Sequence, residues 1–221
     1  MIGSGFVYRE KPDGTLKCMG FSNRQIKHDK IVEIPEYEDG KKVSEIAETA
    51  FQNDSMERLF LPRSIKKIDK YAFHKCPNLK HVVIGGMEII QIEEGAFQEC
   101  KSLTDFEKFG YIELVGHSVF ANCTSLEKVD PCCINKIPEY SFWGCRNLNY
   151  FSFMSKNLIV EAFAFENCND LKEIDILHDF QFHESFWNIL KKAKITCEDS
   201  CKMNELAYLG CEIYGLDELP F

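Results

Sequence analysis

A phrase built on Ala-Phe returns along the chain at a nearly constant interval, and this repetition constrains the fold more than any other feature. The aromatic residues of the phrase are Phe51, Phe73, Phe97, Phe120, Phe142, Phe165 and Phe186. Successive members lie 22, 24, 23, 22, 23 and 21 residues apart, so the period is about 23. Periods of roughly 20–29 residues are typical of leucine-rich repeats, in which each coil is too small to bury its own apolar residues. The spacing therefore predicts a solenoid whose coils pack on their neighbours.

Three further positions are fixed relative to the Phe. Three residues after it stand Cys76, Cys100, Cys123, Cys145 and Cys168, and three further on stand Leu79, Leu103, Leu126, Leu148 and Leu171. Five residues before it, most copies have an apolar residue: Ile46, Ile68, Ile92, Val115, Ile137 and Val160. Triplets such as Leu79, Val82 and Ile84 have the alternation of a short strand with one buried face. Stacked coils are expected to form a parallel sheet, about 35–40 Å long for eight or so coils.

The repeat resembles the BspA-like (TpLRR) family of cysteine-containing leucine-rich repeats. The family phrase is similar to Ile-x-x-Ile-x-x-x-Ala-Phe-x-x-Cys-x-x-Leu-x-x-Val-x-Ile-Pro, which residues 65–84 match up to the final Pro, and the resemblance covers approximately residues 31–190. The departures are Asp54 for Cys and one residue fewer before Met56 in the first copy, Ile189 for Cys in the last, and Lys108 and Pro131 for Ile. The resemblance implies a leucine-rich-repeat solenoid of right-handed coils with a parallel sheet on one face.

The two ends of the chain predict caps. Pro12-Asp13-Gly14 separates two alternating stretches within residues 6–21, which favours a turn joining two strands. The expected organisation is one continuous domain with an N-terminal hairpin cap over 1–30, about seven repeats over 31–190 and a C-terminal cap over 191–221. The first sheet strand is expected at Val32 and Ile34. In the C-terminal part, final strands are expected at 194–197 and 211–216, with a short helix at 201–209.

The charge balance restricts the partner. With 26 basic and 35 acidic residues the formal net charge is −9, which disfavours nucleic acid and favours a protein partner with a basic surface, or a membrane surface. Met1-Ile2-Gly3-Ser4-Gly5 does not begin a secretory leader, and no apolar run approaches the ~20 residues that span a bilayer. The sequence as written predicts a cytoplasmic protein without membrane insertion; the alternative, if a leader is missing, is the cell surface or secretion. The oligomeric state is left open.

The cysteines have a structural interpretation. Five of the eleven occupy the repeated position and are expected to form a ladder of small buried side chains. The odd total and the absence of a leader favour thiols over disulfides. A zinc site made by Cys197, Cys201 and Cys211 with His178 or His183 is the alternative, for which the spacing is weak evidence. No metal and no cofactor are predicted.

Catalysis finds little support in the sequence. The six histidines show no repeated pairing with Ser, Cys or Asp, and no nucleophile with its base is recognisable. Gly85-Gly86 lacks the pattern of a phosphate loop and predicts a turn between a strand and the next coil. The chain is therefore interpreted as a non-catalytic protein–protein interaction module, and the resemblance implies a role in adhesion, host contact or scaffolding. The alternatives are a structural subunit that docks through edges or caps, and a thiol- or zinc-dependent enzyme.

Strand residues that point away from the core indicate where a partner binds. Because Val82 and Ile84 are expected to point inward, His81 and Val83 point outward. The same count gives one outward column of Glu33, Phe60, Val83, Glu107, Asp130, Ser152, Asp175 and Thr196, and a second of Ile31, Arg58, His81, Asp105, Lys128, Tyr150, Glu173 and Lys194. The predicted partner-binding face consists of Phe60, Val83, His81, Asp105, Glu107, Asp130, Tyr150, Glu173 and Asp175. Apolar anchors beside acidic groups combine contact with electrostatic steering.

Overall fold

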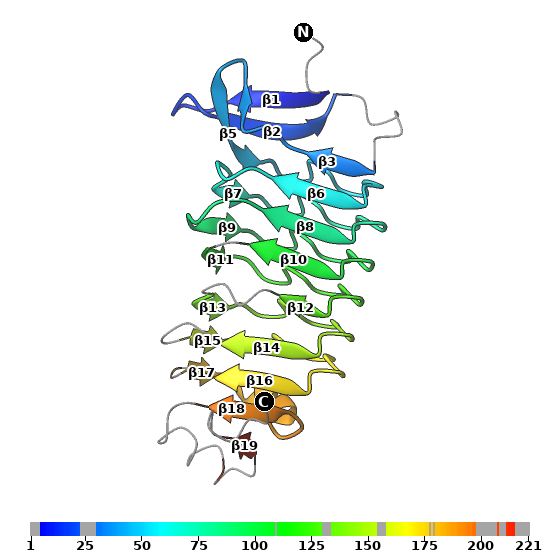
Figure 1. Cartoon of the computed structure of the whole chain (residues 1–221), viewed down its shortest axis with the longest axis vertical. Helices are drawn as coiled ribbons and strands as arrows, with labels where there is room; N and C mark the ends of the chain where they lie inside the picture. Colours follow the sequence, from blue (N-terminus) through cyan, green and yellow to red (C-terminus); the bar gives the residue numbers. More distant parts are fainter. Residues whose placement is uncertain are drawn as a thin grey trace.

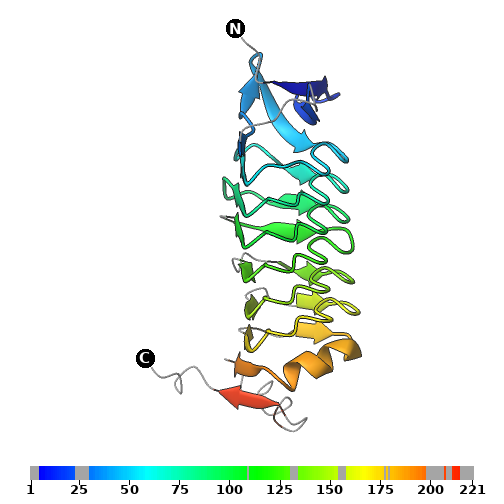
Figure 2. The ribbon, with the colours of Figure 1, turned by 90° about the vertical axis from the view of Figure 1, so that its right-hand side faces the viewer.

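The protein is a long stack of short coils. The computed structural model describes residues 5–22, 30–108, 110–129, 134–153, 158–176, 178, 180–197, 207 and 211–214. The coils follow one another along the long axis, with a hairpin at the N-terminal end (Figure 1). The same stack seen from the side carries a short helical turn near its C-terminal end (Figure 2). The predicted solenoid with coils of about 23 residues is confirmed.

One column of strands forms the front sheet, in which all neighbours are parallel. Its first part contains β3 (Ile31–Glu33), β6 (Arg58–Leu61), β8 (His81–Ile84), β10 (Asp105–Lys108) and β12 (Lys128–Val129). Its second part contains β14 (Tyr150–Phe153), β16 (Glu173–Ile176), β18 (Lys194–Cys197) and β19 (Glu212–Tyr214). The expected strands at 32–34, 194–197 and 211–216 therefore exist, with slightly different limits. The helix expected at 201–209 lies outside the described residues except for Ala207.

A second column of strands forms a side sheet along the left-hand edge of Figure 1, and the sequence predicted only its N-terminal hairpin. It begins with β1 (Phe6–Glu10), β2 (Leu16–Phe21), β5 (Lys41–Ile46), β7 (Lys67–Ile68), β9 (Ile90–Ile92) and β11 (Ile112–Leu114), and β4 (Tyr37–Glu38) pairs with β5. It continues with β13 (Lys136–Ile137), β15 (Leu158–Val160) and β17 (Phe180–Phe182). Most of these strands have two or three residues, too few for a visible alternation in the sequence.

One marker of the side sheet was predicted at the wrong residue. Val115 is 48% exposed, whereas Leu114 is 3% exposed and pairs with Ile92 of the preceding coil. This coil has one residue more between its buried side-strand residue and Phe120 than the coil before it has before Phe97. Counting back five residues from Phe120 therefore lands on a surface residue.

The N-terminal hairpin is confirmed, and it extends the side sheet. Strands β1 and β2 are antiparallel, and Gly14 has a φ of 78° in the turn between them. Strand β2 then pairs in parallel with β5 of the first coil. At the other end, a 3-10 turn (Glu184–Phe186) leads into the short helix α1 (Trp187–Leu190), in which Leu190 is buried. The turn expected at Gly85-Gly86 is also confirmed, because Gly86 has a φ of 84° and a Cβ there would lie 2.7 Å from Cβ of Arg63.

The core is organised around a column of stacked Phe rings. From Phe51 to Phe165 the centroids of neighbouring rings are 5.1–5.6 Å apart and their planes agree within 10°. Phe186 continues the column at 5.3 Å with a tilt of 37°. Each ring therefore fills the space that the next coil leaves open, as nearest-neighbour packing in a solenoid requires.

The repeated cysteines join neighbouring coils by hydrogen bonds. Each Sγ donates to the carbonyl oxygen of the Phe one coil earlier, at 3.0–3.1 Å. The pairs are Cys76 with Phe51, Cys100 with Phe73, Cys123 with Phe97, Cys145 with Phe120 and Cys168 with Phe142. In the first copy, where Asp54 replaces Cys, Asp54 Oδ1 instead accepts from the N–H of Met56 at 2.9 Å, and Met56 is buried. The cysteines were predicted as small buried side chains; in addition, their thiols form hydrogen bonds between neighbouring coils.

From Phe51 to Phe165, each repeat Phe lies between two residues with left-handed backbone. Two positions before the Phe, the residues with positive φ are Thr49, Tyr71, Gly95, Ser118, Tyr140 and Phe163. Two positions after it, they are Asn53, Lys75, Glu99, Asn122, Gly144 and Asn167. Only two of these twelve residues are Gly, although Gly tolerates this conformation best. The tight turns are therefore imposed by the packing of the coils more than by local preference.

The side sheet is interrupted between β11 and β13. Elsewhere, the residue after the buried side-strand residue donates its N–H to the equivalent carbonyl one coil earlier. These bonds are Asp69 to Ile46, Glu93 to Ile68, Val115 to Ile92, Glu161 to Ile137 and His183 to Val160. Pro138 occupies this place after Ile137, and a proline has no N–H to donate to the carbonyl of Leu114. The side sheet accordingly ends at β11 and starts again at β13.

Candidate functional site

The predicted binding residues lie on the outer surface of the front sheet, in the expected register. In the first column Phe60 pairs with Val83, and Val83 with Glu107. In the second column His81 pairs with Asp105, and Tyr150 with Glu173. Glu107 and Glu173 are exposed, whereas Phe60, Val83, His81, Asp105, Tyr150 and Asp175 are half-buried. Asp130 lies outside the described residues.

The first three strands of the front sheet present an apolar group. Phe60 and Val83 are direct neighbours, and Ile31 is diagonal to Phe60 because it pairs with Arg58. Ile31 is 53% exposed, so a contacting surface can reach this group from outside. The group offers a compact apolar anchor site on an otherwise polar sheet.

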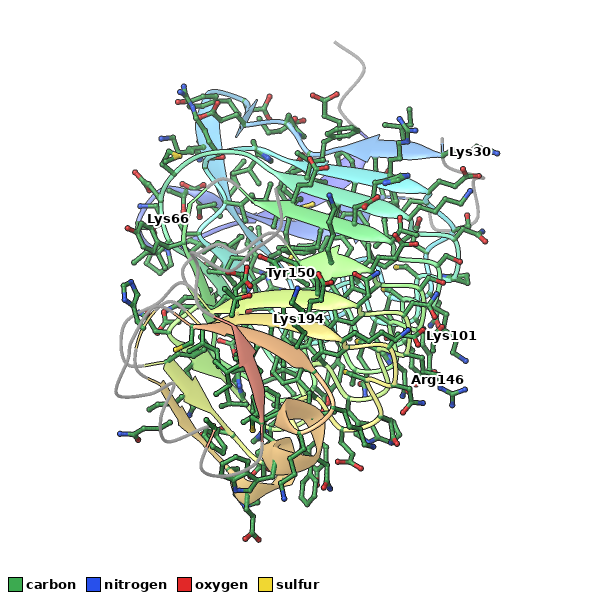
Figure 3. All side chains as sticks on the ribbon, turned by 60° about the horizontal axis from the view of Figure 1, so that its bottom comes forward. Lys30, Lys66, Lys101, Arg146, Tyr150 and Lys194 are labelled. Atoms are coloured by element: carbon green, nitrogen blue, oxygen red, sulfur yellow. The ribbon has the colours of Figure 1, made fainter. Side chains whose placement is uncertain are left out.

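Two hydrogen-bonded pairs fix the acidic part of the front face. His81 Nδ1 lies 2.7 Å from Asp105 Oδ2, and Tyr150 Oη donates to Asp175 Oδ2 at 2.6 Å. Burial and the bond to Asp175 raise the pKa of Tyr150 above its ordinary value, so the phenol stays protonated as a donor. Figure 3 shows Tyr150 and Lys194 together on the strands of this sheet.

Two outward positions contribute little to the face. Ser152 and Thr196 belong to the first column, but the structure buries both residues. The alternation of strand residues correctly predicts which side of the sheet these residues face. It does not predict their accessibility, because larger neighbouring side chains can cover a small one. The accessible face is therefore divided between the apolar group on β3, β6 and β8 and the polar groups that follow.

The first coils of the side sheet are closed by ion pairs. Lys17 Nζ contacts Asp69 and lies 3.3 Å from Glu45 Oε2. Lys67 Nζ lies 3.1 Å from both Asp69 Oδ1 and Glu93 Oε1. Because these two lysines and three carboxylates contact one another across three coils, this part of the surface is interpreted as structural.

Exposed apolar residues gather further along the same side, and sequence reasoning missed them. Ile89, Tyr111 and Val115 are each about half exposed and line one hollow of about 370 Å³ between β9, β11 and β13. The repeat pattern gave no signal for them because it treats residues between the fixed positions as variable surface. Their shared location becomes visible only when the coils are stacked.

The cysteines outside the ladder do not assemble a metal site in the described part of the chain. Cys197 and Cys211 are both buried, and Cys201, the third proposed ligand, lies outside the described residues. His183 Nδ1 is engaged by Ser185, whose backbone N–H is 3.2 Å away. Within the described residues, no group of three or more His, Cys, Asp or Glu side chains is placed to hold a metal ion.

The fold and its strand-lined front face define a leucine-rich-repeat solenoid, a class of protein that generally mediates protein–protein interaction. The chain belongs to the BspA type leucine-rich repeat family, whose six-copy model matches residues 28–132, 87–194 and 135–213. A comparison with curated proteins gives no match. No helix in the described ranges is long and apolar enough to cross a membrane.

Solved structures show the same architecture. The crystal structure of the T. pallidum leucine-rich repeat protein TpLRR is similar with a TM-score of 0.73 at 22% identity, over 97% of each chain. A leucine-rich repeat protein from Bacteroides capillosus has a TM-score of 0.42 at 23% identity, over 59% of this chain and 86% of its own. One from Bacteroides ovatus has a TM-score of 0.47 at 18% identity, over 96% of this chain and 66% of its own. The likeness to TpLRR supports the solenoid fold.

Proposed function

We propose that the chain is a non-catalytic module that holds a protein partner on its front sheet, in an adhesion, host-contact or scaffold role. The observation that carries the proposal is the division of the face into an apolar group around Phe60 and an acidic region from Asp105 to Asp175. Strands β6 and β16 are five coils apart, which corresponds to roughly 24 Å. Because the acidic region already begins on β10, a partner that uses both regions needs an apolar contact and a basic region no farther apart than about this distance.

The acidic region is expected to act on the rate of encounter. Glu107 and Glu173 are exposed, so their attraction to a basic surface is screened beyond about 8 Å at physiological ionic strength. The apolar group excludes water on contact and is expected to determine how long the complex lasts. The two regions therefore predict different kinetic effects of mutation.

Surface plasmon resonance with a partner recovered by pull-down tests the proposal. Phe60→Ala should raise the dissociation rate, and Phe163→Ala serves as a matched control because its exposed ring lies away from the front sheet. Asp130→Lys combined with Asp175→Lys should chiefly lower the association rate at low salt, with Asp170→Lys as the charge control. Unchanged binding by the folded front-face variants would locate recognition elsewhere.

A second candidate function is docking through the side of the solenoid, as a subunit of a larger assembly. It is favoured by the hollow that Ile89, Tyr111 and Val115 surround, since grouped exposed apolar residues are typical of interaction sites. Ile89→Ser combined with Tyr111→Ser should then abolish pull-down or self-association measured by light scattering, while Phe60→Ala leaves it intact. The opposite pattern supports the front-face proposal.

A further inference from the structure

A second hollow lies at the corner where the front and side sheets meet, in the first three coils. It is about 540 Å³ in volume, within the range of roughly 300–1,000 Å³ that ligand pockets occupy. Four segments line it: the turn of the β1–β2 hairpin, the β4–β5 hairpin, and the corner turns after β6 and β8. We refer to it as the corner hollow.

Two of the four basic side chains in the corner hollow are neutralised within the protein. Lys11 Nζ lies 2.6 Å from Glu45 Oε1 and 3.1 Å from Asp13 Oδ2. Arg63 Nε lies 3.2 Å from Glu36 Oε1. These pairs hold the walls in place and leave no unpaired positive charge on Lys11 or Arg63.

The other two basic side chains have no acidic partner among the described residues. Lys42 Nζ lies 5.9 Å from the ring centroid of Tyr37, which orients the ammonium group without neutralising it. Lys66 is exposed, and Figure 3 shows it on the left-hand edge of the molecule, away from Lys101 and Arg146. Glu88 is the one lining carboxylate without an ion pair in the described structure. The corner hollow therefore presents two ammonium groups without an ion pair among the described residues, against one unpaired carboxylate.

A buried hydroxyl in the lining of the corner hollow has no hydrogen-bond partner. Ser64 is 4% exposed, and its Oγ meets no donor or acceptor in the described structure. Its neighbour in the lining, Ser44, is equally buried, but its Oγ lies 2.7 Å from Thr15 Oγ1 and 3.3 Å from Lys11 Nζ. Buried polar groups are nearly always paired, so an unpaired hydroxyl in the lining of a hollow that also contains two ammonium groups without an ion pair points to an acceptor supplied from outside.

We propose that the corner hollow binds a small oxyanion, of the size of a carboxylate, sulfate or phosphate group. In this site the Ser64 hydroxyl donates to one oxygen, and the ammonium groups of Lys42 and Lys66 supply charge-assisted hydrogen bonds to the others. The site lies outside the front face and uses basic groups, whereas the front face offers acidic ones. It is therefore independent of the partner proposed for the front sheet.

Titration of the ¹⁵N-labelled protein with acetate, sulfate and phosphate at low ionic strength tests the proposal. The amide signals of Lys42, Ser64 and Lys66 should shift and saturate with at least one of the three anions. Lys66→Glu should weaken binding about tenfold or more, and Ser64→Ala about fivefold. Glu88→Gln should tighten binding about two- to threefold, because it removes an unpaired negative charge.

Lys101→Glu is the matched control, since it makes the same charge change at the opposite edge of the molecule, and it should leave binding unchanged (Figure 3). Thermal melts establish that each variant is folded. The anion that binds most tightly indicates whether the natural ligand carries carboxylates or sulfate or phosphate groups. Shifts that grow without saturation, or an equal loss in Lys66→Glu and Lys101→Glu, would overturn the proposal.

Discussion

The thiol of Cys123 donates to the carbonyl oxygen of Phe97 in the preceding coil, with Sγ and O 3.1 Å apart. The same carbonyl also accepts the N–H of Cys100 at 3.2 Å, so it bonds both within its coil and to the next. Burial raises the pKa of the Cys123 thiol well above its usual value, with the neighbouring Cys145 adding to the effect. The thiol therefore remains protonated and available as a donor at neutral pH.

The ladder cysteines should be inert in the folded protein. All five are fully or almost fully buried, and burial raises the pKa of Cys168 to about 12. Because the thiolate is the reactive form, thiol reagents should leave all five unmodified without denaturant and label them after unfolding. Mass spectrometry of the labelled protein checks this. Rapid native labelling of three or more of them would contradict the ladder.

Leu126→Ala should destabilise the protein by about 2–5 kcal/mol, because it leaves a cavity between two coils that cannot collapse around it. Leu126 is 0% exposed in the middle of the stack. The free energy of unfolding from denaturant melts measures the effect. Glu127→Ala, at the exposed neighbour, is the control and should change stability by less than about 0.5 kcal/mol. A loss below about 1 kcal/mol for Leu126→Ala would be inconsistent with its position in the core.

Asp69→Asn should make stability less dependent on acidic pH. Burial alone would raise the pKa of Asp69, but the bonds and charges of Lys17 and Lys67 outweigh it and hold the pKa below its ordinary value. The pairs therefore add stability above the unfolded pKa of about 3.9, and this stability is lost as the pH falls through the lowered folded pKa. At pH 7 the variant should be about 1–3 kcal/mol less stable than the wild type.

Urea melts between neutral pH and the acid limit of folding measure this difference. It should shrink steadily once the pH is below about 4, because Asp69 is then protonated in the unfolded chain, and it should vanish once the pH is low enough to protonate Asp69 in the folded wild type as well. Asp170→Asn, at an exposed residue, provides the control and should run parallel to the wild type. A difference that stays constant with pH would show that Asp69 acts through packing instead of charge.

The junction at Pro138 should be the least protected part of the side sheet. Pro138 has no N–H to donate to the carbonyl of Leu114. The backbone amides of β11 and β13 should therefore exchange with solvent faster than those of β7 and β9. Pro138→Glu supplies the missing donor, as Glu93 and Glu161 do in other coils, and should slow this exchange. Hydrogen-exchange mass spectrometry measures both effects.

Overall stability of Pro138→Glu should change by less than about 1 kcal/mol, because the gained hydrogen bond is offset by the greater freedom of the unfolded chain. Pro77→Glu, at an exposed residue in a turn, is the control and should leave exchange in β11 unchanged. Equal protection of all side-sheet junctions in the wild type would contradict the interruption.

The repeated parts of the fold were predictable from the sequence, because the residues that make each contact recur at the same positions in several copies. The register that places Phe60 beside Val83 follows from the repeated Leu and Ile positions alone. Side strands such as Lys67–Ile68 are too short for an alternating pattern, so the second sheet was missed. The extra residue after Leu114 displaced the count to Val115 for a similar reason: fixed spacing fails where a coil changes length.

The candidate sites were only partly predictable. The outward direction of His81 and Tyr150 follows from alternation, but their bonds to Asp105 and Asp175 depend on the distance between coils. The corner hollow joins residues from four separate turns, and Ser64 has no sequence feature that distinguishes it from an ordinary surface serine. Such sites arise from how non-repeated turns meet, which one sequence does not report.

The bond from each cysteine to the Phe of the preceding coil also bears on how such proteins change in length. Both partners occupy the same places in every internal coil, so a chain that gains or loses one complete coil forms an identical bond at the new junction. Recombination between misaligned copies in the gene would therefore produce foldable products directly. The extent of the surface offered to a partner can change in steps of one coil, without any compensating mutation in the interior.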